Sequence, residues 1–258
     1  MRKFQLLVST MNQVDLSIID KMNIHSDTLI INQTDHYEYN HTTLNQYDIQ
    51  MLSFAERGVG LSRNSALMRS DAEIIEFADD DMIFKDNHQE LVLNEFAKHP
   101  EADAILFSLE SLNDKRPLLK ISKYARLSRR EALKYGCARL AVRKDKMLYN
   151  NLSFSLLFGG GCIYGSGEDT ILLQRMLDVG LKIYKSPIKV ADVQQANSSW
   201  FNGYTEKYYV DKGALFAAAL PTLCWPYACI TALKTERKAT TFRYLCLGIK
   251  EFKKRSKG

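Results

Sequence analysis

The sequence predicts an α/β protein with a mostly parallel sheet flanked by helices. Four short apolar runs, at residues 4–9, 28–32, 72–78 and 103–108, alternate with segments of helix length. The runs are largely hydrophobic instead of strictly alternating, which is typical of strands that are covered on both faces. Polar residues follow three of these runs, and the carboxyl ends of strands line the ligand site in sheets of this kind.

The second half of the chain continues the α/β pattern. Residues 111–150 are basic and polar, and they predict a helical segment at 128–136 followed by a strand at 138–144. A turn with five glycines between Gly159 and Gly167 precedes a helix at 170–179, for which Gly180 fits the C-cap. A further strand, 181–187, is expected to end at its proline.

Composition excludes several classes of protein. Hydrophobic residues at 46% and charged residues at 25% are ordinary globular values, so a disordered or fibrous chain is not expected. Five cysteines without a C-x-x-C pair argue against a disulfide framework and a structural zinc site, and favour a reducing compartment. The first apolar stretch is too short for the core of a signal peptide. We therefore expect a cytoplasmic protein.

The net charge of +5 is concentrated at the C-terminal end. Residues 234–258 carry nine Lys or Arg and two Glu, whereas the remaining residues have a net charge of −2. A basic tail on a nearly neutral body predicts an anionic surface as partner, and argues against nucleic-acid binding by the body of the protein.

The C-terminal segments have membrane-like features. Residues 213–233 contain no charged residue, but Pro221 and Pro226 would break a spanning helix. Two short apolar helices, either buried or lying in the membrane surface, are therefore favoured over a span. In the tail, Phe242, Leu245, Cys246, Ile249 and Phe252 share one helical face beside lysines and arginines. This pattern predicts a helix lying on a membrane surface, and the alternative is a helix that packs on the body with a solvated basic end.

Three adjacent aspartates, Asp79, Asp80 and Asp81, follow the predicted strand at 72–78. Their mutual repulsion is destabilising unless a cation neutralises it. Because alternate residues at a strand end point to the same side, Asp79 and Asp81 can converge on one ion. Hard oxygen ligands suit Mg²⁺ or Mn²⁺, and a helix N-cap or a solvated acidic turn is the alternative interpretation.

Further motifs flank the aspartates in a fixed order. Ser9-Thr10-Met11 ends the first strand, Gly60-Leu61-Ser62-Arg63-Asn64 opens a helix, and Gly167-Glu168-Asp169 precedes Gly180-Leu181-Lys182-Ile183. Over about residues 4–190 this order and spacing resembles the family 2 nucleotide-sugar glycosyltransferases, most of all bacterial enzymes of capsular and exopolysaccharide synthesis. The chain departs from that pattern at Ser9, where a proline is usual, and at Gln194 and Gln195, where many relatives have a metal-binding histidine.

The resemblance implies a GT-A (Rossmann-like) fold and an inverting, metal-dependent transfer of a hexose from a UDP-sugar. Asp79 and Asp81 would hold Mn²⁺ or Mg²⁺, which neutralises the departing diphosphate. Asp169 would be the general base, and Glu168 would contact a sugar, unless both are only first-turn acids favoured by the helix dipole. The expected contacts of the donor nucleotide are Thr10, Asn32, Gln33, Arg63, Asn64, Asp79 and Asp80.

The resemblance also implies partners and a division of the chain. The acceptor would be a lipid-linked oligosaccharide at the inner face of the cell membrane, which the protein would approach as a peripheral enzyme. Residues 1–110 would bind the nucleotide sugar, residues 111–200 would bind the acceptor and carry the catalytic pair, and residues 201–258 would form a lid and the membrane-associating helices. The lid would use the aromatic residues Trp200, Phe201, Tyr204 and Tyr208.

Two other functions remain open from the sequence. A sugar-nucleotide nucleotidyltransferase has a related fold, but it needs a glycine-rich phosphate loop with a basic residue after the first strand, and residues 8–17 (VSTMNQVDLS) contain neither. A non-catalytic membrane-associated binding module is the third interpretation, and it would use the basic tail alone.

Overall fold

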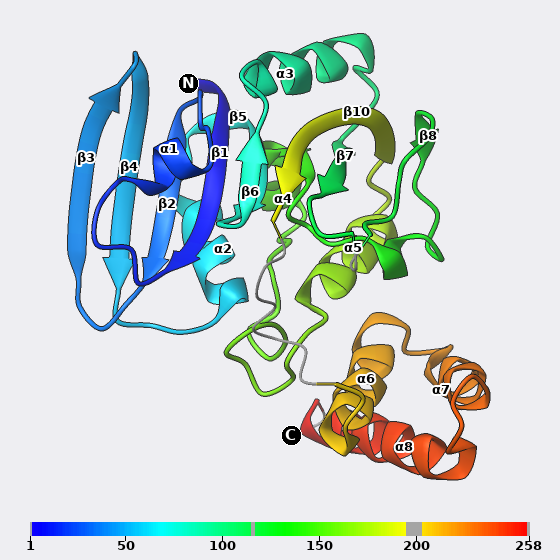
Figure 1. Ribbon diagram of the computed structural model, residues 1–258. Coiled ribbons are helices and arrows are strands. Elements are labelled where there is room, and N and C mark those ends of the chain that lie inside the picture. The colour runs from blue at the N-terminus through cyan, green and yellow to red at the C-terminus, as the bar shows by residue number, and fades with distance from the viewer. Residues whose placement is uncertain (1, 115–116, 195–202, 257–258) are drawn as a thin grey trace.

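The protein forms one ten-stranded sheet with helices on both faces, as the computed structural model shows (Figure 1). The structure describes residues 2–114, 117–194 and 203–256. The strands are β1 (Arg2–Met11), β2 (Thr28–Gln33), β3 (Glu38–Leu44), β4 (Tyr47–Phe54), β5 (Ala72–Asp79), β6 (Met82–Phe84), β7 (Ala104–Ser111), β8 (Ala125–Arg126), β9 (Leu140–Arg143) and β10 (Ile183–Val193). The helices are α1 (Ile18–Lys21), α2 (Val59–Arg69), α3 (His88–Lys98), the 3₁₀ turn η1 (Ala132–Lys134), α4 (Lys144–Tyr149), α5 (Glu168–Asp178), α6 (Glu206–Ala219), α7 (Cys224–Leu233) and α8 (Lys238–Arg255).

The sheet has the order β3-β4-β2-β1-β5-β9-β7-β10-β6, and β8 pairs with β10. The central strands β4, β2, β1 and β5 are parallel neighbours, as are β7 and β10. Strand β9 is inserted between β5 and β7 and is antiparallel to both. The expected mostly parallel α/β sheet is therefore confirmed, with antiparallel strands at β9 and at the edges.

Two hydrophobic cores cover the two faces of the sheet. On one face, Leu7 and Phe77 pack with residues of α2, α4 and α5. On the other face, Leu6 and Val8 pack with residues of α1 and α3. Successive residues of β1 thus enter opposite cores, which is why the strand is apolar along its length instead of alternating with polar residues.

Several sequence expectations for the second half were wrong in detail. The helix expected at residues 128–136 is only the 3₁₀ turn η1, whereas the expected strand at 138–144 is β9. Strand β10 does not end at Pro187 but continues to Val193. The register shifts between Lys185 and Lys189, so Pro187, which has no N–H to donate, lies at an irregularity of the ladder.

The three C-terminal helices form a separate layer beside the sheet (Figure 1). Helices α6 and α8 cross at two glycines. A Cβ atom on Gly213 would lie 2.1 Å from the carbonyl oxygen of Leu245, and one on Gly248 would lie 1.9 Å from that of Val210. The two backbones are in direct contact because neither glycine has a side chain.

Most of the apolar stripe of the tail packs within this layer, whereas Phe242 at its N-terminal end is 37% exposed. Leu245 and Ile249 on α8 are fully buried against Phe216 on α6 and Ala228 on α7. The structure therefore bears out the packing alternative for Leu245 and Ile249, and binding of the tail to a membrane stays a prediction. Among the described residues, no helix combines the length and apolar character that crossing a membrane requires.

The sheet is continuous across the division expected at residue 110. Strand β7, which contains that position, pairs with β9 and β10, which follow it. Residues 203–256 contain only the three helices α6, α7 and α8.

The glycine contact between α6 and α8 predicts a stability effect. Gly248→Ala introduces a Cβ atom that the Val210 carbonyl cannot accommodate, so the helices must separate. We expect a loss of about 1–3 kcal/mol in the free energy of unfolding, measured by urea denaturation. Gly160→Ala is the control, because no atom lies within 4 Å of its added Cβ. Equal stability of the two variants would contradict the direct backbone contact.

Candidate active site

The predicted polar residues lie together at the carboxyl ends of three neighbouring strands. Strand β1 aligns Ser9 with Asp79 of β5, and Thr10 with Asn32 of β2. All three strands run in the same direction, so their carboxyl ends meet at one edge of the sheet. This edge is the ligand-binding position of open α/β sheets.

A buried arginine joins this edge to the acidic pair that begins α5. Arg63 on α2 donates from Nη2 to Asp79 Oδ1 at 2.8 Å, and from Nη1 to Asp169 Oδ1 at 2.6 Å. Nη1 also lies 3.3 Å from Glu168 Oε1. Thus two motifs about 90 residues apart in the sequence converge on one guanidinium group.

The environment of Arg63 makes this cluster strongly coupled. Its side chain is only 3% exposed and lies over the ring of Phe154, 5.2 Å from the ring centroid. Burial disfavours the charged guanidinium, but the carboxylates of Asp169, Asp79 and Glu168 outweigh burial and hold its pKa above the usual value. Arg63 therefore stays a cation in the interior, and its charge depends on the three carboxylates.

Glu168 and Asp169 differ in environment although they are adjacent. Glu168 is 8% exposed, and its Oε2 accepts a hydrogen bond from the Gly167 amide at 3.0 Å. Burial, followed by the negative charge of Asp169, raises the pKa of Glu168 from 4.5 to about 7. The Asp169 side chain is more exposed, at 22%, and Arg63 fixes its orientation. The more accessible carboxylate of the pair is thus Asp169.

Most residues that are predicted to contact the nucleotide form hydrogen bonds with the loops at the strand ends. Thr10 donates to Asp80 Oδ2 at 2.6 Å and accepts from the Gln13 amide. Asn32 bonds both backbone groups of Gln13, and Gln33 accepts from the Gly58 amide at 2.7 Å. These residues are brought together as expected, and direct contact with a nucleotide stays a prediction.

Arg63 and Asn64 make side-chain contacts within the protein, and their contact with a nucleotide stays a prediction. The two terminal nitrogens of Arg63 donate to Asp79 and Asp169, whose side chains are 42% and 22% exposed. Both polar atoms of the Asn64 side chain bond the backbone of Phe154. The reason is local: α2 packs between the strand ends and the 154–167 segment, so its polar residues serve that contact.

The aspartates at the end of β5 fit a divalent cation in chemistry. Asp79 and Asp81 are partly exposed carboxylates on either side of Asp80, which is held by Thr10. Within the described ranges, no three His, Cys, Asp or Glu side chains are grouped to hold a metal. Mg²⁺ and Mn²⁺ commonly use one or two carboxylates and complete their shell with phosphate and water. The residues present therefore suit an ion that binds together with a diphosphate.

Glycines of the turn before α5 are explained by packing of the chain on itself. Gly159 and Gly167 have φ angles of +112° and +120°, which side chains rarely adopt. A Cβ on Gly159 would lie 2.7 Å from Val59, and one on Gly167 would lie 2.6 Å from Leu215. Close packing against Val59 and Leu215 therefore accounts for a glycine at both positions.

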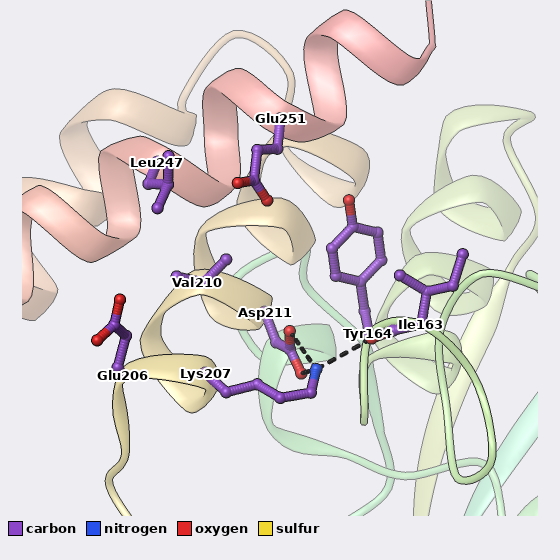
Figure 2. Close-up of a pocket in the computed structure, with 8 residues that line it drawn as sticks. All are labelled: Ile163, Tyr164, Glu206, Lys207, Val210, Asp211, Leu247 and Glu251. Carbon is purple, nitrogen blue, oxygen red and sulfur yellow. Dashed lines mark hydrogen bonds and ion pairs between the residues drawn. The ribbon is translucent and has the colours of Figure 1, made fainter.

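Helix α6 holds the same turn through polar contacts that the sequence did not indicate. The Asp211 carboxylate accepts from the Gly165 amide at 2.9 Å, and Lys207 Nζ bonds both Asp211 and the carbonyl of Ile163 (Figure 2). Ile163, Lys207 and Asp211 border a pocket of about 510 Å³, which Figure 2 shows between the turn, α6 and α8. The turn that positions Glu168 and Asp169 is thereby attached to the C-terminal helices.

Part of the expected lid cannot be placed. Trp200 and Phe201, like Gln195, lie outside the described residues. Tyr204 and Tyr208 lie at the start of α6, with ring centroids 5.3 Å apart. Gln194 donates from its backbone amide to the carbonyl of Asp81 at 2.9 Å, so Gln194 lies beside the aspartates.

Comparison with solved structures identifies the fold as the GT-A type expected from the motifs. The crystal structure of S. aureus TarS residues 1–349 in complex with UDP-GlcNAc matches 98% of this chain and 72% of that chain, with a TM-score of 0.61 and 15% identity. The UDP complex of the same TarS fragment matches 98% of this chain and 71% of that chain, with a TM-score of 0.59 and 16% identity. No protein-family model and no curated protein sequence matches the chain. At this identity, the likeness shows a common fold.

The raised pKa of Glu168 predicts a pH-dependent stability. A carboxyl that holds its proton more tightly in the folded state stabilises the fold below pH 4.5, and that contribution is lost as the pH rises through about 7. Glu168→Gln cannot ionise, so it should not lose this contribution. The free energy of unfolding of the variant minus that of the wild type should therefore be larger at pH 8 than at pH 5, by up to about 3 kcal/mol.

The measurement is urea denaturation of both proteins at the two pH values. Glu90→Gln, which alters an exposed carboxyl on α3, should leave the pH dependence unchanged. If the free energies of unfolding of Glu168→Gln and the wild type differed by the same amount at pH 5 and pH 8, the raised pKa of Glu168 would be contradicted.

Proposed function

We propose that the protein is an inverting glycosyltransferase that uses a UDP-sugar as donor. The GT-A-type fold supports this proposal, because the similar TarS structures are complexes with UDP-GlcNAc and UDP. The site supports it independently, because it places acids of two kinds at the ligand edge of the sheet. One group follows a strand, and the other begins a helix.

The observation that carries the proposal is the bridge from Arg63 to Asp79 and Asp169. Transfer of a sugar needs a group that neutralises the departing diphosphate and a base that activates the acceptor. Asp79, a candidate ligand of the neutralising cation, and Asp169, a candidate base, both contact the guanidinium group of Arg63. A structural ion pair would need one carboxylate, whereas this buried arginine contacts three, of which Asp79 is the most exposed at 42%.

Asp169 is the general base of the proposed reaction. The acceptor hydroxyl oxygen attacks the anomeric carbon of the donor, and its proton passes to an oxygen of Asp169. The bond from that carbon to the diphosphate oxygen breaks, and the electron pair leaves with UDP. Attack opposite to the leaving group inverts the configuration. Arg63 fixes Asp169 through Oδ1, which limits the rotation of the carboxylate.

Glu168 is proposed to contact the sugar rather than to exchange a proton with the acceptor. It is the more buried member of the pair, and its Oε2 is held by the Gly167 amide. With a pKa near 7, a protonated Glu168 can donate a hydrogen bond to a sugar oxygen at neutral pH.

Asp79 and Asp81 are the residues that would hold Mn²⁺ or Mg²⁺. When bound, the ion neutralises negative charge on the diphosphate as a Lewis acid. Asp80 is kept in place by the Thr10 hydroxyl, so it supports the turn between β5 and β6. Thr10, Asn32 and Gln33 shape the loops at the strand ends where the nucleotide would lie.

The acceptor is proposed to be a lipid-linked oligosaccharide in the synthesis of a surface polysaccharide. The support is the resemblance to enzymes of that class and the basic C-terminal segment, which suits an anionic membrane. The protein would then act in the cytoplasm at the inner face of the membrane. The nucleotidyltransferase alternative is not favoured, because Asn12 and Gln13 follow β1 where that class needs glycine and a basic residue.

Donor binding is tested by thermal unfolding with UDP, GDP and dTDP, each with and without Mn²⁺. We expect UDP with Mn²⁺ to raise the Tm by several degrees, because saturation at about 100 times Kd adds about 2.7 kcal/mol. Asp81→Asn should remove the Mn²⁺-dependent part. Asp71→Asn, at the other end of β5, is the control. Stabilisation by GDP or dTDP alone would contradict a UDP donor, and no shift with any nucleotide would contradict the donor site.

The base is tested with Asp169→Asn. The amide oxygen can still accept from Arg63, so the fold and the Kd for UDP should remain within about twofold of the wild type. Transfer should fall by at least about 100-fold, as measured by UDP release from UDP-GlcNAc, UDP-glucose or UDP-galactose with membrane-extracted acceptor lipid. Asp178→Asn, at the far end of α5, is the control. Near-normal transfer by Asp169→Asn would assign the base to another residue.

A further inference from the structure

Helix α7 has an apolar face that no described part of the protein covers. Pro226, Cys229, Ile230 and Leu233 recur at helical spacing and are all exposed, and Leu223 extends the stripe by one turn. Ile230 is 50% and Leu233 is 66% exposed. The opposite side of α7, with Cys224 and Ala228, is buried against the neighbouring helices. A helix that is apolar on both sides and solvated on one is unusual for a soluble surface.

Basic side chains lie at both ends of this stripe. At the start of α7, Lys253 of α8 lies over the Trp225 ring, 5.7 Å from its centroid. At the end of α7, Lys234, Arg237 and Lys238 follow in the exposed turn, with Glu236 as the one acidic residue between Leu233 and Lys250. Apolar residues flanked by lysines and arginines suit the boundary between acyl chains and anionic headgroups.

We propose that α7 and its basic ends form a docking surface for an anionic lipid bilayer, with the apolar stripe of α7 inserted among the headgroups. The sequence pattern pointed to the apolar stripe of α8, whose Leu245 and Ile249 are used for packing on α6 and α7. It left open whether the helices of residues 213–233 are buried or lie in the membrane surface. The inference concerns a different helix and does not depend on the proposed transferase activity.

Charge favours a bilayer over a second copy of this chain as the occupant. In a twofold dimer through α7, the lysines and arginines at the ends of one stripe would face those of the other copy. Like charges that face each other across an interface oppose association. An anionic bilayer instead attracts these groups, and each basic residue near its surface strengthens binding.

The position of α7 connects this surface to the candidate site. Helix α7 lies at the outer end of the C-terminal layer (Figure 1), and α6 of the same layer holds the turn before α5 through Asp211. A bilayer bound at α7 would therefore hold the protein with a fixed relation between the membrane and Asp169.

The test is co-sedimentation of the full chain with sucrose-loaded vesicles, without nucleotide. We expect binding to phosphatidylcholine vesicles that contain 30% phosphatidylglycerol, weaker binding in 0.5 M salt, and little binding to phosphatidylcholine alone. Ile230→Asp/Leu233→Asp should lower the partition coefficient at least tenfold. Leu148→Asp/Tyr149→Asp alters two exposed apolar residues on α4 and should bind as the wild type does.

The charged ends are tested separately. Lys234→Gln/Lys238→Gln should lower vesicle binding roughly tenfold or more. The control Lys21→Gln/Lys98→Gln, which removes the same number of positive charges from α1 and α3, should have little effect. In a Trp200→Phe background, Trp225 is the only tryptophan, so its emission should shift to shorter wavelength on addition of anionic vesicles.

The outcomes separate the alternatives. All variants must retain the wild-type circular dichroism spectrum, which is expected for the substitutions on α1, α3, α4, α7 and α8 and at Lys234 because those side chains are exposed. Equal vesicle binding by the Ile230/Leu233 variant and the wild type would overturn the proposal. A wild-type dimer that dissociates on this substitution, together with no vesicle binding, would also overturn it and identify α7 as a self-association surface.

Discussion

The buried guanidinium of Arg63 is the interaction on which the site depends. A charge removed from water is strongly destabilising unless partners surround it, and here three carboxylates from a strand end and a helix start do so. The same contacts fix the distance between two segments that the chain brings together from far apart. Replacing this cluster with apolar residues could give an equally stable core, so its presence indicates a requirement other than stability.

The cluster also separates the properties of its two adjacent acids. One cation near three carboxylates leaves an excess of negative charge, and the most buried group, Glu168, bears the consequence as a raised pKa. Asp169, directly bonded to Arg63 and more exposed, is held as an oriented acceptor. Two adjacent acids at the start of one helix can thus have different functions, because one is more buried and the other is more closely paired with Arg63.

The sequence predicted those parts of the fold that are determined locally. Strands β1, β2, β5 and β7 are continuous apolar runs because both faces are covered, and their ends could be placed from the polar residues that follow. The hairpin β3–β4 was missed because β3 is an exposed edge strand with little apolar signal, joined by Asn45 and Gln46 at positive φ. The convergence of Arg63 with Glu168 is non-local, and no spacing in the sequence reveals it. The hydrogen bond from Gly165 in the glycine turn to Asp211 could not be predicted for the same reason.

The C-terminal helices show why an amphipathic pattern alone does not identify a membrane surface. Helices α7 and α8 both have apolar residues at helical spacing, and only packing decides which face is covered. On α8 the glycine at position 248 brings the helix against α6, so Leu245 and Ile249 next to it are enclosed. On α7 no glycine provides such a contact for the outer stripe, and Ile230 and Leu233 remain exposed. Helix α6 contacts α8 through backbone atoms, and it contacts the glycine turn before Asp169 through the Asp211 side chain. The path from the outer helices to Asp169 therefore includes few rotatable side chains. Orientation at a surface can therefore be transmitted to the site by rigid contact, without a conformational change.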